Sequence, residues 1–140
     1  MKIRKIAIKN KISELERINN KIERISDEWE ISEHLSFNIN LVIEEIFSNI
    51  VFYGYRDKNE HKINITFTSN KDHLKIKIED DAQEFNPLFI PTHRCKYNSP
   101  DDAEVGGLGI HLVKNIMDDL KYSRKHDRNI LIMKKKITQL

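Results

Sequence analysis

The sequence predicts one α/β (α+β) domain, a two-layer sandwich in which helices cover one face of a mixed, mostly antiparallel sheet. The chain has 140 residues, enough for one core at roughly 100–200 residues per domain, so 1–140 is expected to be a single domain. Hydrophobic residues make up 39% and charged residues 33%, a mixture typical of globular proteins. Helical and strand periodicities follow one another in the order β-α-α-β-β-loop-α-β-β.

The first half of the chain predicts a short strand and two helices. Residues 3–8 alternate weakly and are expected to form an edge strand. From Lys11, spacings of three and four predict an amphipathic helix whose buried face comprises Ile12, Leu15, Ile18, Ile22, Ile25 and Trp29. Ser32 is expected to cap a second helix, from Leu35 to about Gly54. Because this helix has apolar side chains on nearly every side, burial on more than one face is expected.

The second half predicts two hairpins separated by an irregular segment and a helix. Residues 62–68 and 74–78 alternate and form a hairpin with one apolar face. Residues 81–105 contain all three prolines and lack a sustained period, which indicates a long loop. A short helix is expected from Leu108 to about Asp118. Two strands, near 120–125 and 129–137, should follow and meet at Asp127-Arg128.

Composition excludes several classes of protein. The formal net charge of +2 argues against direct nucleic-acid binding, which usually needs a large basic excess. The single cysteine, Cys95, excludes an internal disulfide and indicates a reducing compartment. No apolar run approaches the roughly 20 residues of a membrane helix, and no secretory signal follows the charged start. The expectation is therefore a cytoplasmic protein without a membrane partner.

Glu45 and Asn49 form the first polar cluster in apolar surroundings. They lie four residues apart, so they share one face of the second predicted helix. A buried carboxylate and amide need partners, and a ligand or metal ion is one such partner. The alternative is structural: a half-solvated Glu45, with Asn49 bonded to the backbone.

Asp80 is the second candidate. With the period of a strand it falls on the same side as Leu74, Ile76 and Ile78, so its carboxylate is expected to point inward. It could accept a hydrogen bond from a ligand amine in an apolar pocket. Alternatively, it caps the following loop by bonding to a backbone amide two residues on.

The third cluster is the glycine-rich run Gly106-Gly107-Leu108-Gly109. Three of the four glycines in the chain fall there, directly before a predicted helix. Glycines allow close approach of the backbone, and amides at a helix N-terminus suit phosphate. The alternative is a tight turn into the helix. The usual phosphate-loop and dinucleotide fingerprints are absent from the sequence.

In this order the three clusters resemble the motifs of the GHKL ATPase superfamily, which has the Bergerat ATP-binding fold. The matching segments are Glu45-Ile46-Phe47-Ser48-Asn49, Asp80-Asp81-Ala82-Gln83-Glu84-Phe85-Asn86-Pro87 and Gly106-Gly107-Leu108-Gly109-Ile110-His111-Leu112. The short chain and the segments 49–55 and 117–120 are similar to bacterial anti-sigma-factor serine/threonine kinases. Two positions depart from the pattern: Ala82 stands where the family usually has Gly, and Tyr53 where relatives commonly carry His.

The resemblance implies ATP and Mg²⁺ as cofactors and a role for each matching residue. Asn49 would coordinate Mg²⁺, Asp80 would accept a hydrogen bond from the adenine amino group, and Glu45 would be the catalytic base. The remaining residues expected to bind the nucleotide are Ala82, Phe85, Gly106, Gly107, Leu108, Gly109 and Ile110. Residues 88–105 would form a mobile lid over ATP.

The resemblance also implies partners. A kinase of this kind would bind a sigma factor and phosphorylate a Ser or Thr on a small antagonist protein, in a partner-switching pathway. By the same analogy the chain could form a homodimer, to which the first helix could contribute. The alternative function is an ATP-holding regulatory module that sequesters a partner without phosphorylating it.

Overall fold

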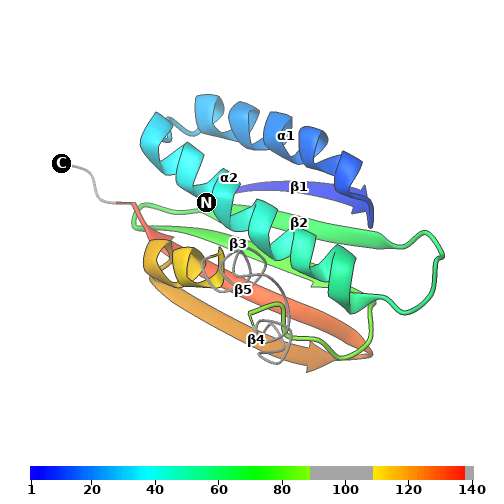
Figure 1. Ribbon diagram of the computed structural model, residues 1–140. Helices are drawn as coiled ribbons and strands as arrows, with labels where there is room; N and C mark the ends of the chain where they lie inside the picture. The colour runs from blue at the N-terminus through cyan, green and yellow to red at the C-terminus, as the bar shows by residue number, and fades with distance from the viewer. Residues whose placement is uncertain (89–108, 138–140) are drawn as a thin grey trace, which may run out of the picture.

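The computed structural model describes residues 1–88 and 109–137, and Figure 1 shows their arrangement. The strands are β1 (Lys2–Lys9), β2 (Lys62–Ser69), β3 (His73–Asp80), β4 (Asp119–Lys125) and β5 (Arg128–Lys136). The helices are the short 3₁₀ turn η1 (Ile12–Glu14), α1 (Leu15–Glu28), α2 (Glu33–Asn49), the π-helical turn η2 (Ile50–Gly54) and a helix over residues 109–116. The layered α/β class is confirmed, with helices above one face of the sheet.

The sheet has the strand order β1-β2-β3-β5-β4, and every described pair of strands is antiparallel. The expectation of a mixed sheet is therefore wrong for the described strands. A single helix between neighbouring strands would return the chain to a parallel strand. Here α1 and α2 run in opposite directions between β1 and β2 (Figure 1), so the second helix reverses the chain again and the two strands become antiparallel.

Strand positions agree closely with the sequence prediction. The first strand is an edge strand paired with β2, and β2 and β3 form the expected hairpin. The last turn is one residue earlier than expected, because His126 and Asp127 occupy it with φ of 53° and 59°. Two successive positive φ angles are the geometry of the tight hairpin turn that matches the twist of its strands.

The two long helices begin and end close to the predicted positions. The Ser32 side chain accepts a hydrogen bond from the Leu35 amide at 3.1 Å and caps α2, as expected. The prediction that this helix is buried on more than one face is confirmed where it packs on the sheet and on α1, but its outer side is uncovered, since Phe37 and Phe52 are 62% and 65% exposed. Among the described residues the helices form one layer, so α2 is covered where it faces the sheet, α1 and the start of the helix over residues 109–116.

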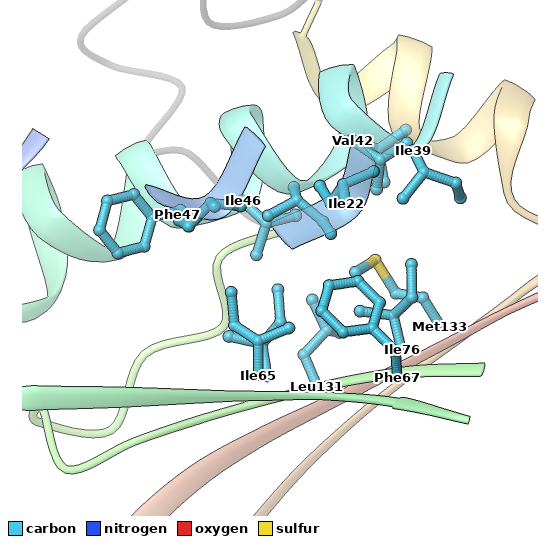
Figure 2. Close-up of a cluster of buried hydrophobic side chains, with 14 of the residues drawn as sticks. Ile22, Ile39, Val42, Ile46, Phe47, Ile65, Phe67, Ile76, Leu131 and Met133 are labelled. Carbon is cyan, nitrogen blue, oxygen red and sulfur yellow. The ribbon is translucent and has the colours of Figure 1, made fainter. Parts of the chain in front are cut away.

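The core lies between this helical layer and the sheet. Figure 2 shows Ile22, Ile39, Val42, Ile46 and Phe47 on the helical side. They meet a second set from the strands, comprising Ile65, Phe67, Ile76, Leu131 and Met133. Register explains the second set, because cross-strand partners occupy the same face of a sheet. The predicted apolar alternation of β2, β3 and β5 thus becomes one continuous buried surface.

The continuous helical stretch Glu33–Gly54 is long and apolar enough to cross a membrane by length and composition alone. The expectation that no uninterrupted apolar run approaches this length still holds, because Asn38, Asn40, Glu44 and Glu45 interrupt the stretch. This length and composition are weak evidence for a membrane span, since a core helix of a soluble protein can have both. Ile39, Val42, Ile43 and Ile46 of this stretch are almost fully buried against the sheet and α1.

Candidate functional site

One row of polar side chains crosses the end of the apolar sheet face. Asp80 on β3 is paired with Asn129 on β5, which is paired in turn with Arg124 on β4. Asp80 and Asn129 are each only 1% exposed. The inward direction predicted for Asp80 is thus confirmed, and the strand register brings two further polar groups beside it.

The Asp80 carboxylate is held by two hydrogen bonds to one oxygen. Its Oδ1 accepts from the backbone amide of Ala82 at 3.0 Å and from Nδ2 of Asn129 at 2.8 Å. The first bond is the loop cap that the sequence offered as the alternative. Burial raises the pKa of Asp80, while these two hydrogen bonds act to lower it. Within the described residues, Oδ2 is the oxygen left for a ligand donor.

Asn129 was missed by the sequence reasoning. Its Nδ2 also donates to the carbonyl of Gln83 at 2.7 Å, so the side chain ties β5 to the loop after β3. Its Oδ1 accepts hydrogen bonds from the Phe85 amide, the Tyr122 hydroxyl and the Arg124 guanidinium. One signal could have found it: Asn129 occupies the inward position of the alternation that continues with Leu131 and Met133.

Ala82 and Phe85 lie in the loop that leaves Asp80, against the end of η2. Ala82 is 3% exposed, and a Cβ added to Gly54 would meet its methyl group at 3.2 Å. Gly54 would also meet the Phe85 ring at 3.7 Å, so glycine makes room for both side chains. Arg124 donates to the Ala82 carbonyl at 2.9 Å. Ala82 stands where the family usually has Gly, and its neighbours leave room for the additional methyl group.

Glu45 and Asn49 are brought together one turn apart on α2, as predicted. Burial is the main cause that raises the pKa of Glu45, and the hydrogen bond from Asn49 partly opposes it. Asn49 is 5% exposed, and its Nδ2 donates to the Pro87 carbonyl at 3.1 Å. This hydrogen bond from Asn49 to the backbone is the structural alternative that the sequence left open. It leaves the amide oxygen of Asn49 as the atom suited to a cation.

Gly109 lies directly against the Glu45 carboxyl group. A Cβ built at Gly109 would overlap the carboxyl carbon and both oxygens of Glu45, so any other residue would require the Glu45 side chain to move. The neighbouring Ile110 is 8% exposed and belongs to the hydrophobic core. The other glycine-run positions, Gly106, Gly107 and Leu108, lie outside the described residues, as does the expected lid apart from Leu88.

A cluster of four side chains, Tyr55, Asp57, His61 and Asp81, supports the loop that follows β3. His61 stacks on Tyr55 with ring centroids 4.5 Å apart and contacts Asp57 and Asp81 at 2.8 and 3.1 Å. Tyr55 donates its hydroxyl to Asp81 at 3.1 Å. Hydrogen bonds to Asp57 and Asp81 raise the pKa of His61. Because Asp81 follows Asp80 directly, this cluster fixes the backbone beside the buried carboxylate.

The described residues contain no group of three or more His, Cys, Asp or Glu side chains that could hold a metal ion. A cation at Asn49 would therefore have few protein ligands and would take its other oxygens from a ligand and from water. Mg²⁺ commonly binds in this way, through one or two protein groups and substrate phosphates.

Comparison with protein families identifies this arrangement. The sequence model of the histidine kinase-like ATPase domain matches residues 8–135, nearly the whole chain. The chain belongs to this family. Membership confirms the resemblance drawn from the three motifs.

Curated relatives of the chain are named as kinases. It is 28% identical to serine-protein kinase RsbW of Oceanobacillus iheyensis over 100 residues, which cover 69% of this chain and 63% of that protein. It is 29% identical to serine/threonine-protein kinase BtrW of Bordetella bronchiseptica over 112 residues, 78% and 75% of the two chains. For RsbW of Listeria monocytogenes serotype 4a, 24% identity covers 60% and 55%. The match thus spans less than two thirds of the length of both RsbW proteins.

Proposed function

We propose that this chain is an ATP-dependent serine/threonine-protein kinase. The observation that carries the proposal is the buried Asp80, fixed by Asn129 and Ala82 with one oxygen left for a donor, in a chain of the histidine kinase-like ATPase family. An adenine amino group is such a donor. The names of the relatives support protein phosphorylation.

The residues that the structure brings together fit ATP and Mg²⁺. Asp80 would hold the adenine beside Ala82 and Phe85, and Asn49 would supply its amide oxygen to Mg²⁺. The magnesium ion would neutralise phosphate charge during transfer. Gly109 and Ile110 begin the described part of the helix where phosphate would be bound, together with Gly106, Gly107 and Leu108.

Glu45 would act as the catalytic base that orients the hydroxyl of the protein substrate. Its raised pKa brings the carboxylate closer to the range in which it can take a proton near neutral pH. Its position one turn from Asn49 would place it on the same side of α2 as the Mg²⁺ site. Positioning is the larger part of the task, because phosphoryl transfer depends on alignment and charge neutralisation.

We further propose that the kinase is a cytoplasmic anti-sigma factor in which residues 1–140 form one domain. It would bind a sigma factor and phosphorylate a Ser or Thr of a small antagonist protein. Support comes from the similarity to the RsbW and BtrW kinases and from the family motifs in the sequence. A homodimer belongs to the same proposal.

Calorimetric titration with ATP, with and without Mg²⁺, tests the nucleotide site. We expect magnesium-dependent binding that Asn49→Ala loses, while Asn59→Ala, an exposed residue outside the site, binds as the wild type does. A transfer assay with radiolabelled ATP and a candidate antagonist then tests the kinase. Binding without transfer to any antagonist would favour the ATP-holding module, and absence of binding would contradict both functions.

A further inference from the structure

A groove lies at the end of the sheet opposite to Asp80. It is formed by the start of β1, the α1–α2 turn, the β2–β3 turn and the end of β5, with a volume of about 650 Å³. Asp80 ends β3, whereas the β2–β3 turn precedes its first residue. At a rise of roughly 3.3 Å per residue, the two ends of this strand are about 23 Å apart. The groove is therefore separate from the proposed ATP site.

Positive charge dominates the groove. Four lysines line it, Lys2, Lys71, Lys135 and Lys136, against one carboxylate, Glu30. Of the four, Lys135 contacts Asp118 at 3.8 Å. The other three make no ion pair with any residue that the structure describes. The start of α2 also borders the groove, and the partial positive charge of a helix N-terminus adds to the same field.

The groove also offers an apolar surface. Trp29, Ile31, Leu35 and Ile137 line it. Trp29 is 8% exposed, and the Arg4 guanidinium lies 6.0 Å from the centroid of its ring. The ligand should therefore carry both carboxylate oxygens and apolar side chains.

We propose that this groove binds an acidic segment of a partner protein, with an apolar side chain of the segment against Trp29. The lysines are flexible point charges spread over separate elements, which suits carboxylates spaced along a peptide. The groove is open and is lined from four parts of the chain, as an extended segment requires. Complementary charge would speed the encounter and select acidic partners over basic ones.

Trp29 is the single tryptophan of the chain, so its fluorescence reports on the groove directly. The probe is a synthetic acidic octapeptide with six Asp or Glu residues and two leucines. Its control is the same peptide with Asn and Gln in place of Asp and Glu. We expect the acidic peptide to change the emission of Trp29 with an affinity that falls as salt is raised, and the neutral peptide to have no effect.

Matched variants locate the binding site. The double variant Lys71→Glu, Lys136→Glu should bind the acidic peptide at least about tenfold more weakly, because two attractions become repulsions. The double variant Lys58→Glu, Lys121→Glu changes the net charge equally at exposed positions outside the groove and should bind as the wild type does. Circular dichroism checks that both variants are folded.

Three outcomes would overturn the proposal. They are equal binding of the neutral and acidic peptides, equal loss in the two double variants, and no change in emission at millimolar peptide. If succinate or inorganic phosphate alone binds as tightly as the peptide, the groove is a small-anion site instead and the proposal of a protein segment fails. ATP titration of the same samples is a separate readout, so failure of the kinase proposal is recognised independently.

Discussion

Asp80 and Asn129 serve the fold and the proposed ligand through the same hydrogen bonds. The bond from the Ala82 amide caps the loop, and the bond from Asn129 joins β5 to β3. Both fix the direction of the carboxylate before any nucleotide arrives, which lowers the ordering cost of binding. A structural role for Asp80 is therefore no argument against a binding role.

One substitution at Asp80 and one at Glu45 test adenine binding and phosphoryl transfer separately. Asp80→Asn can present an N–H to the adenine amine, so we expect ATP affinity to fall about 10- to 100-fold, the effect of losing a hydrogen bond to a charged group. Glu45→Ala should leave ATP affinity nearly unchanged and abolish phosphoryl transfer. Calorimetry and a transfer assay measure the two effects. Equal loss of ATP affinity in both variants would contradict the separate roles.

Asn129 should be important for stability as well as for the site. Asn129→Ala leaves Asp80, the Gln83 carbonyl and the Phe85 amide without their partner, so we expect the free energy of unfolding to fall by about 2–3 kcal/mol. Urea denaturation measures this change, with the exposed Asn59→Ala as the control. A loss below about 0.5 kcal/mol, the usual range for surface positions, would show that the network contributes little.

At the scale of elements, the Tyr55–His61–Asp81 contacts join the end of η2, the start of β2 and the loop after β3. Two segments that are close in the sequence thus meet a third, more distant one beside Asp80, since Asp81 lies 20 residues after His61. The charge of His61 is central, because the ring contacts the carboxylates of Asp57 and Asp81. The stability of this junction should therefore depend on pH.

The pKa shifts of His61 and Asp57 set the direction of this pH dependence. The pKa of His61 is raised above 6.5, so its contribution is complete below that value and is lost as pH rises through the raised pKa. The hydrogen bond to His61 lowers the pKa of Asp57 below 3.8, so its contribution is lost only as pH falls through that lowered pKa. We expect His61→Gln to destabilise the protein in urea at pH 6 more than at pH 8. An equal effect at both values would contradict a charged His61.

The whole molecule is one helical layer on one antiparallel sheet, which leaves one side of α2 without a covering layer among the described residues. The two sides can be compared with the same residue type. Phe67 is 1% exposed and points from β2 toward the helices (Figure 2), whereas Phe52 of η2, the turn that continues α2, is 65% exposed. Their contributions to stability should differ accordingly.

We expect Phe67→Ala to lower the free energy of unfolding by about 3–5 kcal/mol, because it removes a large core side chain and leaves a cavity. Phe52→Ala should change it by no more than about 0.5 kcal/mol. Chemical denaturation of both variants checks this pair. A large loss for Phe52→Ala would show that a second layer or a partner covers the outer side of α2 in solution.

The sequence by itself determined the order of the elements, the inward direction of Asp80 and the shared helix face of Glu45 and Asn49. These are local properties, because strand and helix periods fix which side chains lie on one face. Tertiary structure decided what lies across from each residue. The pairing of β3 with β5 put Asn129 beside Asp80, and the approach of Gly109 to Glu45 needed residues 64 positions apart to meet. No period encodes such contacts, since they depend on which strands become neighbours and in what register. For the same reason the sequence could not predict that the outer side of α2 stays uncovered, or that lysines from separate elements gather in one groove.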